Sequence, residues 1–211
     1  MAAMNCFTIL LGGQAVCTPR LLAQVKGSRV IAADSGMAHA DGLSVEPELW
    51  VGDFDSATAE LKKSYAHIPR LTFPESKDAT DGEIAISEAF RRGATSLILV
   101  GSFGGQTDHS LAHVMQLVEL ASRGADVMLT SGNEEARYLS DELTFTGLAV
   151  GTRLSIIPIT NLKGLSISSV RWPLNNRDVL RGSTLTLSNE TTGDPQLALK
   201  SGEAVVVVYP S

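Results

Sequence analysis

The sequence predicts a mixed α/β fold, with a doubly wound, mostly parallel sheet in its N-terminal part and an antiparallel β-sandwich in its C-terminal part. Up to about residue 132, short apolar runs alternate about six times with segments of helical periodicity. Apolar strands separated by helices indicate a parallel sheet covered on both faces. Beyond that point, short β-prone runs separated by turn residues replace the helical pattern, as in antiparallel sandwiches or barrels. We therefore expect an α/β domain over residues 1–132 and a β-sandwich domain over residues 133–211.

The elements of the first part can be placed from apolar runs and helix signals. Strands are expected where short apolar runs end in turn residues or charges, at 7–11, 29–33, 49–51, 71–73, 96–100 and 126–130. Helices are expected between them, at 19–26, just before 41, and at 57–66, 81–92 and 108–122. Pro19 suits the first turn of its helix, and Ser56 suits the N-cap of the helix that follows it.

The second part consists of β-prone runs alone. Strands are expected at 136–138, 143–145, 153–157, 165–167, 184–187, 197–199 and 204–209. Asn175-Asn176 and Gly193-Asp194-Pro195 are interpreted as turns between them.

Composition excludes several classes of protein. The chain has 211 residues, 44% of them hydrophobic, and a formal charge of −6 with no basic stripe, which argues against general nucleic-acid binding. Cys6 and Cys17 lack metal-ligand spacing and suit a reducing compartment. We see neither a signal peptide nor an apolar run near the roughly 20 residues that a membrane helix needs. A cytoplasmic protein is expected.

Two aspartates follow the apolar run Leu49-Trp50-Val51. Asp53 and Asp55 are separated by one residue, so their carboxylates project to the same side of an extended chain. Two carboxylates this close repel each other, and a divalent cation relieves the repulsion. Mg²⁺ prefers such oxygen ligands. Taken alone, however, the pair is also explained as an exposed turn.

Other expected strand ends carry aspartate as well. Asp34-Ser35-Gly36 follows one strand, and Asp78 and Asp81 stand at the start of a helix. Each of these residues could simply cap a helix, where acidic side chains are favoured. Ligands of parallel sheets, however, bind beyond the carboxyl ends of the strands. We therefore favour one shared Mg²⁺–phosphate site at this edge.

Glycines mark two further strand ends. Gly12-Gly13 follows the first strand, and Gly104-Gly105-Gln106-Thr107-Asp108-His109 precedes a helix. Glycines before a helix N-terminus let backbone N–H groups approach phosphate oxygens. The alternatives are a flexible turn with Asp108 as N-cap and a His109 with no catalytic role. Ordinary P-loop and dinucleotide-binding motifs are not found in the sequence.

The second part offers one aromatic candidate. Trp172 stands between Arg171 and Pro173, after Ser166 and Ser168, and Ser188-Asn189 follows later in the chain. Composition alone favours a core position for this tryptophan. An edge position, where the indole stacks on a flat or cationic ligand, is the alternative.

Six motifs together resemble those of the thiamine pyrophosphokinase family, in that family's order and at similar spacing over nearly the whole chain. They are Ala33-Asp34-Ser35-Gly36, Pro47-Glu48-Leu49-Trp50-Val51-Gly52-Asp53-Phe54-Asp55-Ser56, Lys77-Asp78-Ala79-Thr80-Asp81, Gly104-Gly105-Gln106-Thr107-Asp108-His109, Val170-Arg171-Trp172-Pro173-Leu174 and Ser188-Asn189. The resemblance implies a domain that binds ATP with Mg²⁺, a second domain that helps to bind thiamine, and a homodimer with active sites between subunits. The implied reaction converts ATP and thiamine to AMP and thiamine diphosphate.

The resemblance also implies roles for individual residues. Asp53, Asp55 and Asp81 are the implied metal ligands, and with Asp78 they form the implied catalytic set; Asp81 or Asp78 could accept the hydroxyl proton. The implied nucleotide contacts are Gly12, Gly13, Asp34, Ser35, Gly36, Lys77, Thr80, Gly104, Gly105, Gln106, Asp108 and His109. The implied thiamine contacts are Ser166, Ser168, Trp172, Ser188 and Asn189, with Trp172 stacking on thiamine in the neighbouring subunit's site.

Some positions depart from the family pattern. Gln106 stands where arginine is usual, Ser35 where glycine is usual and His113 where asparagine is frequent; Ser169-Val170-Arg171 replaces Gly-Leu-Lys.

Two other functions remain open. An aspartyl-nucleophile phosphatase could use Asp53, although such enzymes usually carry the motif after the first strand, and a phosphoryl-enzyme on Asp53 would support this alternative. A non-catalytic thiamine or nucleotide sensor would not need the carboxylates.

Overall fold

The computed structural model describes residues 5–55, 57–72 and 79–210, which form two compact units. The first unit comprises the chain up to His113 together with Gly124–Gly132, and the second comprises Val114–Arg123 and the chain from Asn133 onward. The predicted domain boundary between residues 132 and 133 stays a prediction.

The first unit is built on six parallel strands, as the sequence predicts. They are β1 (Cys6–Leu10), β2 (Arg29–Ala33), β3 (Leu49–Gly52), β4 (Arg70–Thr72), β5 (Ser96–Val100) and β6 (Asp126–Thr130), and their order is β6-β5-β1-β2-β3-β4. The chain runs outward from β1 to β4 and then returns to pair β5 with the other side of β1. The strand order therefore reverses between β1 and β5, where open α/β sheets bind their ligands.

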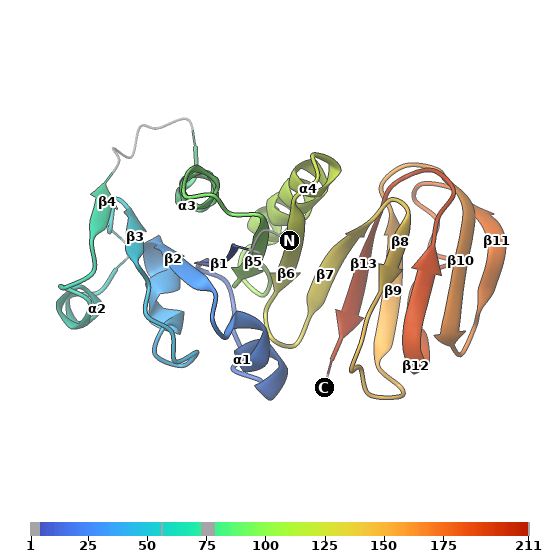
Figure 1. Cartoon of the computed structure of the whole chain (residues 1–211), viewed down its shortest axis with the longest axis horizontal. Helices are drawn as coiled ribbons and strands as arrows, with labels where there is room; N and C mark the ends of the chain where they lie inside the picture. Colours follow the sequence, from blue (N-terminus) through green and yellow to red (C-terminus); the bar gives the residue numbers. More distant parts are fainter. Residues whose placement is uncertain (1–4, 56, 73–78, 211) are drawn as a thin grey trace. The chain divides into compact units, whose positions relative to one another are not determined.

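Helices connect these strands. They are α1 (Pro19–Val25), the 3₁₀ helix η1 (Asp34–His39), α2 (Ala59–Ser64), α3 (Asp81–Arg91) and α4 (Thr107–Ser122). Figure 1 shows α1 and α2 on one side of the strands and α3 on the other. A core on the α1 side joins Leu21 and Val25 to Leu10, Trp50 and Ile98 of the strands. Burial of alternate strand residues beneath helices is what the apolar runs predict.

The second unit contains antiparallel strands. They are β7 (Glu135–Leu139), β8 (Glu142–Thr144), β9 (Arg153–Pro158), β10 (Leu162–Val170), β11 (Leu174–Val179), β12 (Asn189–Ala198) and β13 (Ala204–Tyr209). One set pairs in the order β7-β13-β9, and the other pairs β11-β10-β12-β8. Strand β12 joins the sets, because its first two residues pair with β9 and its later ones pair with β10 and β8. Leu139, Leu154 and Val206 of the first set share a core with Ile167 and Leu197 of the second.

Three expected features of the second unit are wrong. The turn predicted at Gly193-Asp194-Pro195 lies within the continuous strand β12, where a register shift in the pairing with β10 accommodates these residues. The predicted strand at residues 184–187 is a turn, because the buried member of its alternating pattern is Thr186, whose hydroxyl donates to the carbonyl of Ile156, 2.6 Å away. Leu185 and Leu187 are exposed. Conversely, the Asn175-Asn176 pair that suggested a turn lies within β11, where Asn176 takes a positive φ of 51°.

The start of α2 also differs from the prediction. The helix begins at Ala59, and the Thr58 side chain accepts a hydrogen bond from the N–H of Leu61. Thr58 is therefore the N-cap, two residues beyond the expected cap. Ser56 itself, together with Phe73 of the fourth expected strand, lies outside the described residues.

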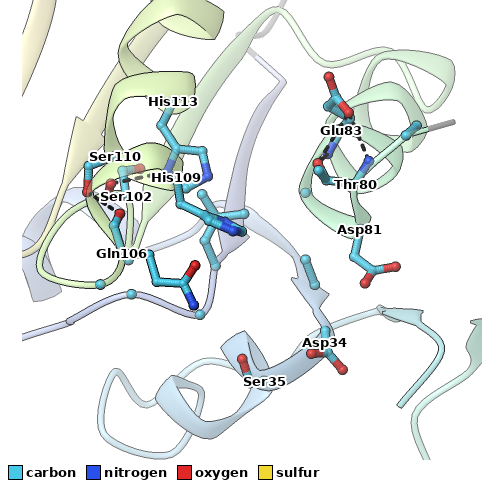
Figure 2. A pocket seen from close by; sticks show the side chains of 18 residues that line it. Asp34, Ser35, Thr80, Asp81, Glu83, Ser102, Gln106, His109, Ser110 and His113 are labelled. Atoms are coloured by element: carbon cyan, nitrogen blue, oxygen red, sulfur yellow. Dashed lines mark hydrogen bonds between the residues drawn. The ribbon is translucent and has the colours of Figure 1, made fainter. Parts of the chain in front are cut away.

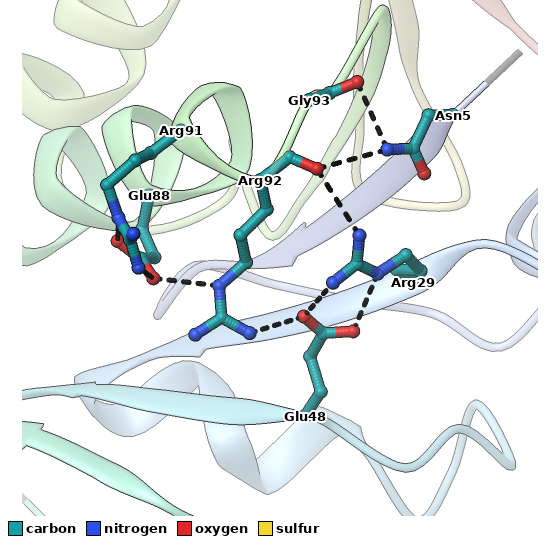
Figure 3. A network of polar contacts seen from close by, with 7 residues as sticks. All are labelled: Asn5, Arg29, Glu48, Glu88, Arg91, Arg92 and Gly93. Carbon is teal, nitrogen blue, oxygen red and sulfur yellow. Dashed lines mark hydrogen bonds and ion pairs between the residues drawn. The ribbon is translucent and has the colours of Figure 1, made fainter.

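A network of ion pairs fastens the end of α3 to the amino ends of β2 and β3 (Figure 3). Glu48 accepts hydrogen bonds from Arg29 at 2.8 and 2.6 Å and from Arg92 at 2.5 Å. Glu88 accepts from both Arg91 and Arg92 at 2.7 Å. The network lies at the amino ends of the strands, the edge away from the expected ligand site. We assign it a structural role.

Removing the charge of Glu88 should destabilise the protein at neutral pH. Hydrogen bonds from Arg91 and Arg92 outweigh burial and lower the pKa of Glu88 from 4.5 to about 2. The stabilisation is therefore complete above pH 4.5 and is lost as the pH falls toward 2. For Glu88→Gln we expect a loss of roughly 2 kcal/mol in the free energy of unfolding at pH 7. The loss should shrink between pH 4.5 and 3, as measured by urea unfolding at several pH values.

The matched control is Glu142→Gln, which removes an exposed carboxylate from β8. It should change the free energy of unfolding little at any pH. A Glu88→Gln loss of the same size at pH 3 and pH 7 would contradict the assignment, because it would then come from packing rather than charge.

Candidate active site

A cavity of about 790 Å³ lies at the reversal point of the first unit (Figure 2). Its walls are the loops after β1, β2 and β5 and the first turns of α3 and α4. The lining residues are Leu11, Gly12, Gly13, Ala33, Asp34, Ser35, Ala79, Thr80, Asp81, Gly82, Glu83, Gly101, Ser102, Gly105, Gln106, His109, Ser110 and His113. A volume of this size is within the range of small-molecule sites, about 300–1,000 Å³.

Three carboxylates meet beside this cavity. One carboxylate oxygen from each of Asp34, Asp53 and Asp55 lies within 4.8 Å of the other two. Asp34 and Asp53 are partly buried and Asp55 is exposed, and Asp34 also lines the cavity. The ends of β2 and β3 thus bring together three of the aspartates that the sequence singled out.

The backbone around these carboxylates is held in unusual conformations. Asp34 has a φ of 44° and Phe54 a φ of 65°, values that residues other than glycine rarely adopt. The Trp50 indole N–H donates to the carbonyl of Asp34 at 2.8 Å, and the Phe54 ring packs edge-on against Trp50 at 4.9 Å. Burial of both rings fixes the two turns. Strain that the surrounding packing maintains is typical of functional sites.

Gly52 is required for the approach of the two turns. A Cβ at this position would lie 3.3 Å from both Cα and Cβ of Asp34, and its φ is 153°. The glycine between Val51 and Asp53 therefore lets the end of β3 pass close to the end of β2. This close approach holds Asp34 next to Asp53.

The start of α3 supplies a fourth carboxylate. Asp81 is the first residue of the helix, and Figure 2 shows its side chain extending toward the part of the cavity that Asp34 lines. Thr80 and Glu83 form a reciprocal capping box, with the Thr80 N–H donating to Glu83 at 2.8 Å and the Thr80 hydroxyl accepting from the Glu83 N–H at 3.2 Å. This cap fixes where the helix begins. Lys77 and Asp78 lie outside the described residues.

Glycines form the floor of the cavity. The Gly13 N–H donates to the carbonyl of Gly101 at 3.0 Å, and a Cβ on Gly13 would lie 2.3 Å from that oxygen. A Cβ on Gly12 would lie 2.5 Å from the Ser35 hydroxyl oxygen. The loops after β1, β2 and β5 therefore touch at these glycines. No side chain therefore projects from these two positions into the cavity, which suits the close approach of a phosphate.

Three other predicted nucleotide contacts do not line the cavity. Gly36 packs against β1, where a Cβ would lie 2.2 Å from the Leu10 carbonyl oxygen. Gly104 takes a φ of 75° and packs against the side chain of Gln14. Asp108 is exposed in the first turn of α4, and its carboxylate accepts from the N–H of His109 at 2.9 Å.

The first two turns of α4 add a polar wall. Figure 2 shows Gln106, His109 and His113 along this side of the cavity. Nδ1 of His113 lies 3.1 Å from the Ser102 carbonyl oxygen, which only accepts, so Nδ1 carries the proton. Burial, with a smaller effect of the neighbouring His109, lowers the pKa of His113. The lowered pKa favours the neutral form of His113.

Sequence reasoning placed neither His113 nor Ser102 in the site. The signal for His113 was its spacing of four residues from His109, which puts both side chains on one helix face. Their rings lie 6.4 Å apart. Ser102 gave no comparable signal in the sequence. In the structure its hydroxyl donates to the Leu99 carbonyl at 2.7 Å.

The predicted thiamine contacts lie in the second unit, where they serve different purposes. Ser168 and Ser188 are exposed, whereas the hydroxyl of Ser166 accepts from the N–H of Asn176 at 3.0 Å. Trp172 is 53% exposed, so the core position that composition favours is wrong. It lies two residues beyond the end of β10, where packing does not enclose it.

The charges of the cavity suit a cation that accompanies an anion. Within the described part of the lining, the charged side chains are Asp34, Asp81 and Glu83, and it includes neither lysine nor arginine. A polyanion would be repelled by these carboxylates unless a metal ion neutralised them. Three converging carboxylates offer the hard oxygen ligands that Mg²⁺ prefers, so the residues present fit this ion.

Comparison with known proteins identifies the family. Residues 22–129 match the family model for the thiamin pyrophosphokinase catalytic domain, and residues 142–206 match the model for the thiamin pyrophosphokinase vitamin B1 binding domain. The sequence is 26% identical to thiamine pyrophosphokinase of Bacillus subtilis over 192 residues, which is 89% of this chain and 90% of that protein. None of the helices in the described ranges is both long and apolar enough to cross a membrane.

Solved structures agree in fold. The structure of thiamine pyrophosphokinase from Bacillus subtilis has a TM-score of 0.85 at 21% identity, covering 98% of this chain and 99% of that one. That of thiamin pyrophosphokinase from Geobacillus thermodenitrificans has a TM-score of 0.80 at 24% identity, with 98% of each chain covered. The chain therefore belongs to the thiamine pyrophosphokinase family and carries both the catalytic and the vitamin B1 binding domain of that family.

Proposed function

We propose that the protein transfers the diphosphate group of ATP to the hydroxyl of thiamine, giving thiamine diphosphate and AMP, and that Mg²⁺ is required. One observation supports this more than any other. Carboxylates of Asp34, Asp53 and Asp55 converge beside a cavity at the reversal point of a parallel sheet. Family membership supplies the acceptor and the group transferred.

The carboxylates are the proposed metal ligands. Asp53 and Asp55 would hold Mg²⁺ together with Asp34, which replaces Asp81 in the set of three that the resemblance implied. Bound Mg²⁺ supplies neutralisation of charge on the phosphates. Asp81 lines the same cavity and is proposed to act at the acceptor hydroxyl, either accepting its proton or orienting it. Asp78 remains the alternative for that role.

The chain's own contribution is then positioning. The substrate's hydroxyl is the nucleophile, so no protein nucleophile is needed, and the two reactants must be held in line. Backbone groups of Gly12 and Gly105 are proposed to face the phosphates, because these residues line the cavity without a side chain. Gly13 is proposed to contribute by leaving room for the phosphates, since its own N–H donates to the Gly101 carbonyl. Gln106, immediately before α4, and His109 in its first turn would contact the nucleotide. Neutral Gln106 cannot supply the charge of the arginine usual in the family.

Other features remain proposals that follow from the family. The second unit is proposed to bind thiamine through Trp172, and the active protein is proposed to be a homodimer with its sites between subunits. The finer architecture is proposed as a doubly wound sheet and an antiparallel β-sandwich; the common core of the two strand sets supports the sandwich. A cytoplasmic location stays a prediction.

The decisive test is the identity of the nucleotide product. Purified protein with Mg²⁺, ATP and thiamine should release AMP and thiamine diphosphate in equal amounts. Chromatography of the reaction mixture measures both products. Omission of Mg²⁺ or addition of a chelator should abolish the reaction. Release of ADP with thiamine monophosphate would contradict diphosphate transfer, and the absence of turnover would favour a binding protein.

Trp172→Ala should weaken thiamine binding selectively. The indole is exposed and offers a flat surface for stacking, so its loss should raise the KM for thiamine about tenfold, or ~1.4 kcal/mol. The KM for ATP should change less than twofold in the same assays. Val150→Ala is the control, because it removes another exposed apolar side chain of the second unit. A larger effect on the KM for ATP would place Trp172 at the nucleotide instead.

A further inference from the structure

Trp172 is exposed, but its backbone is held firmly by one side chain. The Trp172 N–H donates to Oδ1 of Asn189 at 3.1 Å, and Nδ2 of Asn189 donates to the Trp172 carbonyl at 2.8 Å. The amide side chain thus makes both of the hydrogen bonds that an opposing residue of an antiparallel strand would make. The two bonds, one accepted and one donated by the amide, fix the backbone of Trp172 on both sides of its Cα.

The course of β12 explains why a side chain does this. The backbone of Asn189 is paired with Leu154 of β9, whereas β12 pairs with β10 only from Thr191 onward. The Arg171 N–H still reaches the carbonyl of Glu190 at 2.8 Å. At Trp172 the ladder would end, and the Asn189 amide extends it by one residue. Ser188, with a φ of 60°, sets the direction in which the chain enters β12.

A second contact fixes one face of the indole. The Arg171 guanidinium carbon lies 4.7 Å from the centre of the Trp172 ring, in a cation–π arrangement. Arg171 is itself paired with Glu190 at 3.0 Å. One face of the indole is therefore covered, and a ligand that stacks on Trp172 must use the other face. Asn189 and Glu190, neighbours in the chain, hold the backbone and the covered face respectively.

We propose that Asn189 is a positioning residue of the thiamine site: it acts by holding Trp172, while the Arg171–Glu190 pair restricts the indole to a single stacking face. Asn189 was expected to contact thiamine, but its amide is already engaged with Trp172. This inference rests on the proposed function, because it takes thiamine as the ligand of Trp172.

A double-mutant cycle separates positioning from direct contact. Asn189→Ala and Trp172→Ala are made singly and together, and thiamine affinity is measured by calorimetry on the full-length protein as well as by KM. If Asn189 acts through Trp172, Asn189→Ala should weaken thiamine binding about three- to tenfold in the wild-type background and by less than 1.5-fold once Trp172 is alanine. The kcat and the KM for ATP should change little in Asn189→Ala. Equal losses in both backgrounds would overturn the proposal, because they would indicate direct contact with thiamine.

Two further variants guard against a general loss of structure. Asn189→Asp keeps the acceptor for the Trp172 N–H and loses the donor to its carbonyl, so its thiamine affinity should lie between that of the wild-type protein and that of Asn189→Ala. Asn175→Ala, at an exposed asparagine of β11, is the control and should bind thiamine normally. Melting curves monitor folding. Asn189→Asp binding as weakly as Asn189→Ala, with an unchanged melting temperature, would argue against the graded positioning role.

Fluorescence tests the covered face directly. The protein has two tryptophans, and Trp50 is fully buried. A change of fluorescence on altering surface residues near Trp172 is therefore assigned to Trp172. Glu190→Gln releases Arg171 and should alter the emission of Trp172 while weakening thiamine binding severalfold. Unchanged emission and affinity would overturn the part assigned to the Arg171–Glu190 pair. If wild-type protein neither binds thiamine nor forms thiamine diphosphate, the proposed function itself fails, an outcome distinct from additivity in the cycle.

Discussion

Replacing Asp53 by asparagine should abolish turnover without unfolding the protein. Asp53 has an oxygen within 4.8 Å of oxygens from Asp34 and Asp55, so it is central to the proposed metal site. The substitution removes a negative charge and retains size and shape. Loss of a metal ligand at such a site should lower kcat by about 10³-fold or more. Steady-state assays at saturating ATP and thiamine measure this effect.

The local turn should survive the substitution. The Asp55 N–H donates to Oδ1 of Asp53 at 3.1 Å, and the carbonyl oxygen of an asparagine can accept the same bond. The melting temperature should therefore change little. Mg²⁺ binding, measured by calorimetry without nucleotide, should weaken at least tenfold and give a readout independent of activity. Asp141→Asn, at an exposed carboxylate of the second unit, is the control. Near-normal turnover of Asp53→Asn would refute the metal role.

Much of the first unit could be predicted because its signals are local. The strands β2, β5 and β6 have the predicted bounds, since each is a short apolar run with a turn residue or charge after it. Parallel pairing then places all carboxyl ends at one edge. This rule alone brought Asp34 and Asp53 together, although 18 intervening residues separate them in the chain.

The remaining features depend on tertiary contacts that a sequence pattern does not contain. Leu185 and Leu187 flank a polar residue in the alternating pattern of a strand. In the structure, however, Thr186 is buried and its hydroxyl donates to the Ile156 carbonyl, whereas both leucines are exposed. Composition placed Trp172 in the core, but it is exposed, because its position depends on how Asn189 extends a ladder between distant strands. Likewise, the left-handed turns at Asp34 and Phe54 depend on the packing of Trp50. Strain of this kind contradicts local preference and is set by the fold.

A single methyl group at Gly101 should damage both stability and activity. Gly101 follows β5 with a φ of 82°, and a Cβ there would lie 2.3 Å from the carbonyl oxygen of Leu11. That oxygen belongs to the loop that continues into Gly12 and Gly13, which form the floor of the cavity. The left-handed conformation costs an alanine about 1–2 kcal/mol, and the overlap adds roughly 1–3 kcal/mol. Gly101→Ala should therefore lose about 2–5 kcal/mol in the free energy of unfolding.

Gly151 offers a control for the conformational part of this cost. It has a φ of 87°, nearly that of Gly101, but nothing lies within 4 Å of a Cβ there. Gly151→Ala should lose only about 1–2 kcal/mol and keep normal activity. Gly101→Ala should in addition raise the KM for ATP about tenfold or more, because the Leu11 carbonyl can yield only by moving the loop that faces the phosphates. Equal destabilisation by the two variants, with the KM for ATP unchanged in both, would show that the loop tolerates the displacement and that its glycines do not set the geometry of the nucleotide site.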